Sequence, residues 1–511
     1  MRTLPELDEE ANIEDPRLAP CDIDTVDGPV PGLCGTLVVP ERQDDESTTL
    51  SIPIQRIKAQ TPGADALPIL VLGNGPGQSN FQFIPPKELT KANDLIRVGY
   101  RGTDSSVTLE CNEIAAVIRE TPALTEPHLD RLRTAATDCL ERQQRSGHRL
   151  EDFTLEAVAR DLVAALETFE YERIHVLADG FGLQVALELH ARYPDRVERI
   201  VATSPAPLGP FLLNAATFQA HLEAIAGRCA ASDACAAQTD DLLSSFERAR
   251  GSLPSRWGFT SVDSGRLTLV TALSLLARES TVRAVDAWAS AGSGSHAGLA
   301  MMSWLGDNIG QNVFVWGDAL AKTAPLALAR ETNHRDANER NVTHLLGSPA
   351  RLMLFGAAPN GALLPEARPR PLPERRPDAL FIHGTVDPTR AVALESFESE
   401  LGSVQTLIVE DLVLASEAWL LQPSNLARVV AEFVNGGQPS AAQLVKQPWS
   451  FEPGLRLGTM QWFLTVLTVI IPLLLGAFVF LLFRRVKRTI DLERAEHASQ
   501  LSGGDDSQSR S

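Results

Sequence analysis

The stretch from His175 to Val197, HVLADGFGLQVALELHARYPDRV, predicts a buried strand, a tight turn and an amphipathic helix. A serine held on such a strained turn presents its oxygen above a sheet. There a histidine can take its proton, and backbone N–H groups can receive the oxyanion of an acyl-transfer reaction. The small residues Ala178 and Gly182 flank the turn, which puts Gly180 at the nucleophile position. Glycine carries no reacting atom.

The segments around this turn predict the sheet that must hold it. GTLVVPER and LSIPIQRIKA alternate like a hairpin at a sheet edge, and LPILVLG is a buried strand before the turn NGPGQS. Strands then alternate with helical patterns, which predicts an α/β fold with a mostly parallel, doubly wound sheet. From 211 to 365 alanine- and leucine-rich helical patterns replace the alternation and predict a helical lid insertion.

We divide the chain into seven parts. They are a mobile N-terminal segment (1–20), a first core part (21–210), the lid (211–365), a second core part (366–436), a linker (437–461), a transmembrane helix (462–483) and a basic, then disordered cytoplasmic tail (484–511).

The composition of the chain argues against nucleic acid, metal ions and cofactors as partners. The formal net charge of −19 argues against nucleic acid, because affinity for a phosphate backbone comes largely from lysine and arginine. No cysteine has the CxxC or Cys/His spacing of a zinc site, and we expect neither a metal nor a cofactor.

The six cysteines fall into three local pairs, Cys21 with Cys34, Cys111 with Cys139, and Cys229 with Cys235. Three disulfides closing short loops are the favoured interpretation, and they imply an oxidising compartment. Six buried thiols are the alternative, since free cysteine is often buried.

Residues 462–483, WFLTVLTVIIPLLLGAFVFLLF, contain no charge and would span about 33 Å as a helix, which matches a bilayer core. The basic run 484–488 follows directly, whereas the other flank offers only Arg456. This asymmetry predicts a single-pass protein with a cytoplasmic tail and an extracytoplasmic (periplasmic or extracellular) main domain. A buried core helix is the alternative.

Met1 to Pro20 is acidic and has no apolar core of the length an export signal needs. The true start lies upstream, the signal was removed, or insertion relies on the C-terminal helix alone. The last option would leave the cysteines in a reducing cytoplasm, so we favour the first two.

Four stretches in order resemble the α/β-hydrolase fold, and more narrowly its tripeptidyl-aminopeptidase-like, proline iminopeptidase-related branch. The resemblance covers roughly residues 21–436. The stretches are Asn74-Gly75-Pro76-Gly77-Gln78-Ser79, Tyr100-Arg101-Gly102-Thr103, Ala178-Asp179-Gly180-Phe181-Gly182 and Gly384-Thr385-Val386-Asp387-Pro388.

The resemblance implies a catalytic triad, and the chain departs from it at two of the three positions. The nucleophile position is Gly180. The base position falls in the loop after VQTLIVED, where Leu414 is nearest in register and none of the ten histidines lies. Asp387 matches the acid, but an aspartate before proline is also an ordinary helix cap, which we favour. His383, within the preceding strand, is expected to be a packed core residue.

Gly75 and Gly77 match the loop whose amides would bind an oxyanion, although a turn that needs positive φ would keep them too. Asp179 is an alternative, carboxylate nucleophile. If Asp179 were the nucleophile, Leu177 and Phe181 would occupy the positions where the tight turn needs small residues. This argues against Asp179 as the nucleophile.

The residues favour an α/β-hydrolase-fold pseudoenzyme, membrane-anchored and acting by binding as a structural or accessory subunit of a membrane complex. One alternative is an active serine hydrolase or peptidase with a relocated nucleophile, for which Ser79, Ser204 and Ser416 lie in suitable loops. Another is a protein that binds a small ligand or peptide in the old cleft.

Overall fold

The computed structural model describes residues 5–63, 66–73, 75–206, 215–258, 260–312, 314–329, 345–347, 349, 373–397, 400–446, 448–452, 471, 473–475, 477–478 and 481. Within these residues, no helix is long and apolar enough to cross a membrane. Most of the predicted span 462–483 lies outside the described residues.

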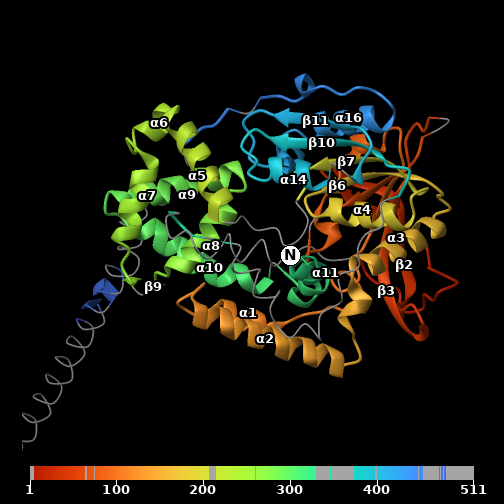
Figure 1. Cartoon of the computed structure of the whole chain (residues 1–511), viewed down its shortest axis with the longest axis horizontal. Coiled ribbons are helices and arrows are strands. Elements are labelled where there is room, and N and C mark those ends of the chain that lie inside the picture. Colours follow the sequence, from red (N-terminus) through yellow and green to blue (C-terminus); the bar gives the residue numbers. More distant parts are fainter. Residues whose placement is uncertain are drawn as a thin grey trace, which may run out of the picture.

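A nine-stranded sheet forms the core, with the strand order β1-β2-β3-β5-β4-β6-β7-β10-β11 (Figure 1). β1, β2, β3 and β5 pair antiparallel in that order, and the six strands β5, β4, β6, β7, β10 and β11 are parallel to one another. The strands are β1 (Ala19–Thr25), β2 (Gly28–Arg42), β3 (Asp45–Ile57), β4 (Ile69–Leu72), β5 (Leu95–Val98), β6 (Ile174–Asp179), β7 (Val197–Thr203), β10 (Asp378–Gly384) and β11 (Val404–Val409). The predicted hairpin (β2 and β3) and the mostly parallel sheet are confirmed. The hairpin is not at the edge, because β1 pairs with β2 and forms the edge strand.

The central strands are buried on both faces, which explains their continuous apolar sequences. In β4, for example, Leu70 and Leu72 join one buried cluster and Ile69 and Val71 the other. The first cluster includes residues of α2 (Glu126–Arg145), α3 (Leu155–Thr168), α4 (Gly182–Arg192) and α14 (Arg390–Phe397), and the second those of α15 (Ala418–Leu421) and α16 (Pro423–Val434). Helices therefore cover both faces, as a doubly wound sheet requires.

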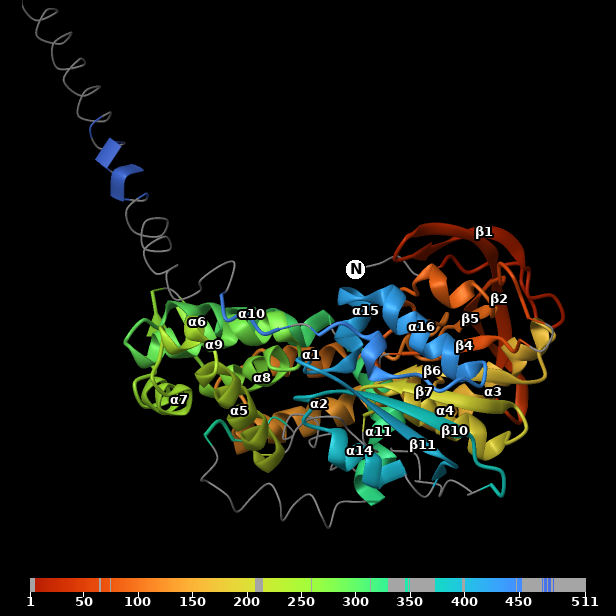
Figure 2. The same cartoon turned by 90° about the horizontal axis from the view of Figure 1, so that it is seen from above.

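The helices α5 to α10, between β7 and β10, have a hydrophobic cluster of their own, in which Phe246 stacks on Trp288 with 4.6 Å between ring centroids, whereas buried residues of α11 join the first cluster of the sheet. Both views place α5 to α9 beside the sheet, away from the β2–β3 hairpin (Figures 1 and 2). We call α5 to α11 the lid. Its elements are α5 (Ala215–Ala230), α6 (Asp233–Ala236), α7 (Leu242–Gly251), β8 (Arg256–Trp257), β9 (Thr260–Ser261), α8 (Ser264–Ser274), α9 (Arg278–Gly292), α10 (Ala297–Asn312) and α11 (Trp316–Ala329).

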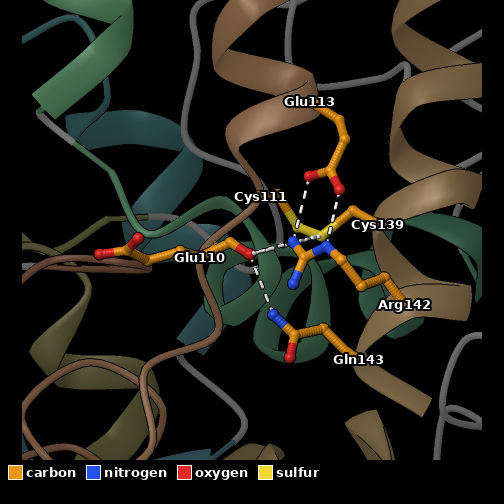
Figure 3. Close-up of a disulfide and its surroundings, with 6 residues drawn as sticks. All are labelled: Glu110, Cys111, Glu113, Cys139, Arg142 and Gln143. Atoms are coloured by element: carbon orange, nitrogen blue, oxygen red, sulfur yellow. Dashed lines mark hydrogen bonds and ion pairs between the residues drawn. A yellow bond between two sulfur atoms is a disulfide. The ribbon is translucent and has the colours of Figure 1, made fainter. Parts of the chain in front are cut away.

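The three predicted cysteine pairs are all disulfides. Cys111–Cys139 joins α1 (Asn112–Ile118) to α2, and Figure 3 shows Arg142 beside it. Arg142 donates from Nε to Glu113 Oε1 at 2.7 Å and from Nη2 to the carbonyl oxygen of Glu110 at 2.8 Å. The disulfide and the arginine thus fasten the same two helices.

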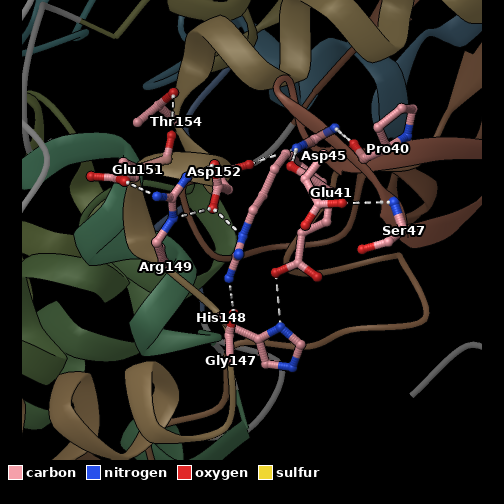
Figure 4. Close-up of polar contacts among 12 residues, drawn as sticks. Pro40, Glu41, Asp45, Ser47, Gly147, His148, Arg149, Glu151, Asp152 and Thr154 are labelled. Carbon is pink, nitrogen blue, oxygen red and sulfur yellow. Dashed lines mark hydrogen bonds and ion pairs between the residues drawn. The ribbon is translucent and has the colours of Figure 1, made fainter.

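The buried side chain of Arg101 connects the β2–β3 hairpin to the core by hydrogen bonds. Arg101 donates to both carboxylate oxygens of Asp161 at 2.6 Å and to the carbonyl oxygens of Asp152 and Glu41 at 2.6 and 3.0 Å. Figure 4 shows the hairpin meeting the segment 147–154, where His148 Nδ1 lies 2.9 Å from Glu41 Oε1. Arg101, which sequence placed in a family motif, is therefore a structural clamp.

Candidate functional site

The turn after β6 has the shape predicted from the sequence. Gly180 has a φ of +52°, its N–H donates to the carbonyl oxygen of Thr203 at 3.0 Å, and its own carbonyl oxygen accepts from the N–H of Ala206 at 3.1 Å. A Cβ at Gly182 would lie 2.0 Å from the carbonyl oxygen of Leu72, so only glycine fits there. The end of β7 and the strand β4 together fix the turn.

Gly180 itself has room for a side chain. A Cβ built there meets no heavy atom within 4 Å, in contrast to Gly182. What favours glycine is its left-handed backbone, which other residues adopt only with strain. The turn therefore has the strand-turn-helix shape predicted from the sequence, with a glycine at its centre.

The carboxyl group of Asp179, next to the turn, accepts hydrogen bonds from two hydroxyl groups. Thr203 Oγ1 and Ser416 Oγ both donate to its Oδ1, at 2.6 and 2.7 Å. Asp179 as a whole is partly exposed. Desolvation raises the pKa of Asp179, and the two hydroxyl donors oppose that rise. Asp179 thus joins β6, β7 and the loop after β11.

The loop after β11 places a serine, not a histidine, at the turn. Leu414 precedes the short 3-10 helix Ala415–Glu417 and contributes no titratable group. Ser416 makes the bond to Asp179, and its N–H donates to Ser204 Oγ at 3.3 Å. Because Ser416 and Asp179 are 237 residues apart, no local pattern could have predicted this pair.

The position matched to the acid belongs to a separate buried pair. Asp387 Oδ2 lies 2.9 Å from His383 Nδ1, and both side chains are 0% exposed. Asp387 Oδ1 also accepts from the N–H of Thr389 at 2.9 Å, so the carboxylate caps the turn before α14. Within the described chain, His383 Nε2 is buried and has no hydrogen-bond partner. This aspartate supports the turn and a core histidine.

The glycine loop after β4 has the positive φ values expected of it, +113° at Gly75 and +74° at Gly77. The N–H of Gly77 donates to Asp318 Oδ2 at 3.1 Å, and the N–H of Gly75 to Gln78 Oε1 at 3.4 Å. An oxyanion would have to compete with these internal acceptors. The amide of Gly77 thus bonds to α11, and the amide of Gly75 bonds within its own loop.

Asp318 belongs to a buried charge network that the sequence did not reveal. Lys322 Nζ donates to Asp318 Oδ1 at 2.5 Å and to the carbonyl oxygen of Arg101 at 3.1 Å, and it lies 5.4 Å from the ring centroid of Tyr100. Burial raises the pKa of Tyr100 well above its usual value, and the carboxylates of Asp104 and Asp318 add to the rise. The network fastens α11 beneath the two loops of the site.

The other predicted candidate serines also have structural roles. Ser79 Oγ accepts from the N–H of Phe81 at 3.1 Å and caps the 3-10 helix Asn80–Gln82. Ser204 has a φ of +44° and accepts from the loop of Ser416. No group of three or more histidine, cysteine, aspartate or glutamate side chains is placed to hold a metal ion in the described part of the chain.

No protein-family model matches the sequence, and the search of curated proteins finds no match. Among solved structures, the chain is similar to proline iminopeptidase from Mycobacterium smegmatis, with 14% identity over 78% of this chain and 98% of that one and a TM-score of 0.34. An α/β hydrolase fold protein from Chitinophaga pinensis has 10% identity over 78% and 97%, with a TM-score of 0.36. An esterase from Thermogutta terrifontis has 12% identity over 78% and 98%, with a TM-score of 0.35.

Likeness at these levels says nothing of activity or substrate. The fold follows from the chain's own topology: antiparallel strands β1 to β3 beside six parallel strands, the crossed order β3-β5-β4-β6, and a strand-turn-helix elbow at Gly180. The chain has the α/β-hydrolase fold. The narrower, proline iminopeptidase-related branch stays a prediction.

Proposed function

We propose that this chain is a non-catalytic α/β-hydrolase-fold protein that works by binding. The observation that carries the proposal is Gly180, which stands at an intact elbow with open space where a nucleophile would project. Replacing a strained residue there by glycine relieves roughly 1–3 kcal/mol of backbone strain. Once catalysis no longer requires the strained residue, this relief has no functional cost.

Two further features support the same proposal. The loop that would carry the base offers Ser416, whose hydroxyl is bonded to Asp179. The amide of Gly77, which would receive an oxyanion, is bonded to Asp318. Nucleophile, base and oxyanion donor are thus each replaced or occupied by a group that holds the structure together.

The proposed setting is a membrane complex, in which the chain is a structural or accessory subunit. The uncharged stretch 462–483 with the basic run after it supports a single anchor with a cytoplasmic tail. The three disulfides support an oxidising, extracytoplasmic location for the main domain. Purification of the native protein from gently solubilised membranes should recover a defined membrane-protein partner.

The test of the non-catalytic proposal is hydrolysis of acyl ester and aminoacyl substrates by the purified full chain. We expect no turnover above the level of a Gly180→Ala variant. Turnover that is abolished by substitution of a residue at the carboxyl edge of the sheet would contradict the proposal.

One geometric observation favours a second candidate, a hydrolase that uses Ser416. Its Oγ lies 2.7 Å from Asp179 Oδ1, and the carboxylate could accept the hydroxyl proton as the oxygen attacks an acyl carbon. Labelling of Ser416 by a fluorophosphonate, lost in Ser416→Ala and weakened in Asp179→Asn, would favour this candidate over the first.

A further inference from the structure

The segment 438–452 follows the last core helix, and its first half lies on the core. The side-chain amide of Gln405 donates to the carbonyl oxygen of Pro439 at 3.0 Å, and the N–H of Val445 donates to Gln422 Oε1 at 2.7 Å. Lys446 pairs with Glu410 at 2.9 Å. These contacts hold the segment against β11 and the α15–α16 connection.

The second half of the segment lies on the lid. Phe451 is 1% exposed and belongs to the lid's hydrophobic cluster, and Trp449 stacks on it with 5.4 Å between ring centroids. The guanidinium of Arg228 lies 5.7 Å from the ring centroid of Trp449, and Gln238 Nε2 donates to the carbonyl oxygen of Phe451 at 3.4 Å. This part of the chain, which follows α16, thus places two aromatic rings against the lid.

The lid residue Arg278 connects this segment to the loop at the elbow. Its Nη1 donates to the carbonyl oxygen of Pro448 at 3.4 Å, and its N–H donates to Glu417 Oε1 at 2.6 Å. Glu417 Oε2 accepts from the N–H of Val413 at 3.0 Å, so one carboxylate holds both ends of the loop 413–417. Ser416, within that loop, bonds to Asp179.

We propose that residues 438–446 and 448–452 form a latch that holds the lid against the loop 413–417, and through it controls access to the elbow. The proposal goes beyond the absence of catalysis, since a latched lid governs whatever binds at the carboxyl edge of the sheet. The latch reaches the lid through two aromatic side chains and two weak hydrogen bonds.

The latch is built to release. Trp449 Nε1 is buried and has no hydrogen-bond partner within the described residues, and burying an unpaired N–H weakens the docking of the ring. The lid keeps attachments to the core that do not involve the segment 438–452. Asp263 accepts from the N–H of Ala123 at 3.2 Å, Arg266 donates to the carbonyl oxygen of Arg119, and Arg228 pairs with Asp411. A released lid would therefore remain attached near α1 and α8, and its movement away from the loop 413–417 would also require the Arg228–Asp411 pair to break.

Hydrogen exchange on the full chain tests the latch. In a Trp449→Ala, Phe451→Ala double variant, we expect amides of α5, α9 and the loop 411–417 to exchange at least tenfold faster. Amides of the β2–β3 hairpin should keep their wild-type rates. The matched control is Lys446→Ala, because its ion pair is 63% exposed on both sides and should leave exchange in the lid unchanged.

Wild-type protection of the lid in the double variant would overturn the proposal. Equal acceleration of the lid and of the hairpin would overturn it too, since it would mean global loss of stability.

A second experiment has an arm on the wild-type chain, whose outcome does not depend on the folding of the variant. A protease site inserted after the exposed Gln438 allows the folded full chain to be cut between α16 and the latch. We expect the C-terminal fragment to co-elute with the rest of the protein after cutting, and the same cut in Trp449→Ala, Phe451→Ala to release it. Release of the wild-type fragment at micromolar concentration would overturn the proposal.

Discussion

Ser416 Oγ donates a hydrogen bond to Asp179 Oδ1 at 2.7 Å, and this bond joins the loop after β11 to the turn at the end of β6. In enzymes of this fold, the nucleophile and the base meet between the same two segments. Here a hydroxyl group and a carboxyl group meet instead. The same two segments are therefore connected, but by a serine–aspartate hydrogen bond and not by a nucleophile–histidine pair.

Ser416→Ala removes one of the two hydroxyl donors to this carboxyl. A buried group that loses a hydrogen-bond partner costs about 1–3 kcal/mol, so we expect the free energy of unfolding to fall by about that amount. Urea denaturation measures it, with the exposed Ser450→Ala as the control. A Ser416→Ala chain as stable as the control would show that the bond contributes nothing.

His175 should make stability depend on pH. It is 5% exposed in β6, and desolvation, followed by the charge of Arg199, lowers its pKa from 6.5 to about 4. Its contribution is complete above pH 6.5, and it is lost as pH falls through the folded-state pKa, because the unfolded chain takes up the proton first.

Below pH 6.5, wild-type stability should therefore fall by up to about 1.4 kcal/mol per pH unit more steeply than that of His175→Gln. Urea denaturation at a series of pH values from 7.5 to 4.5 compares the two chains. Only the difference between the two curves reports on His175. The other buried histidines, His128, His190 and His221, also have lowered pKa values, but they are present in both proteins. Parallel curves would contradict the assignment.

Gly180→Ser tests whether the elbow still has room for its nucleophile. Because a Cβ there meets no atom within 4 Å, the variant should fold and lose only roughly 1–3 kcal/mol, the cost of a side chain at positive φ. Gly182→Ser is the matched control and should fail to fold, since its Cβ would lie 2.0 Å from the Leu72 carbonyl oxygen. Equal damage from the two substitutions, measured by thermal denaturation, would contradict this picture of the turn.

Asp318→Asn should be among the most damaging substitutions in the lid. It leaves Lys322, whose side chain is 1% exposed, without its counter-charge, and breaking a buried pair in this way costs about 3–5 kcal/mol. Adding Lys322→Met should restore much of the loss, because no unpaired charge then remains. Urea denaturation of the single and double variants compares their free energies of unfolding. A double variant no more stable than Asp318→Asn would contradict the assigned Asp318–Lys322 ion pair.

Much of the fold could be predicted from the sequence, because the relevant signals are local. β4 is a continuous apolar run, the elbow is a strand, a glycine-rich turn and a helix within a few residues, and each disulfide closes a short loop. Gly182 was predictable for the same reason, since a tight turn against a neighbouring strand leaves no room for a Cβ.

The contacts that decide the chemistry were not predictable. Asp179 meets Ser416 across 237 residues, and Gly77 meets Asp318 across 241, so neither pair leaves a pattern in one sequence. The segment 438–452 has the composition of a linker, and its contacts depend on a lid surface formed by distant helices. Alignment with the family's triad predicted Leu414 at the base position. The side chain that actually contacts the elbow is that of Ser416, two residues later.

The central claim is that the elbow carries no nucleophile and that no other residue has taken its place. The most direct measurement is fluorophosphonate labelling of the purified full chain, followed by mass spectrometry of every serine-containing peptide. We predict no labelled serine in wild-type protein or in Gly180→Ser, because the loop opposite the elbow bears Ser416 in place of an imidazole. A stoichiometric adduct on one wild-type serine, Ser416 above all, that disappears on its substitution by alanine would contradict the account.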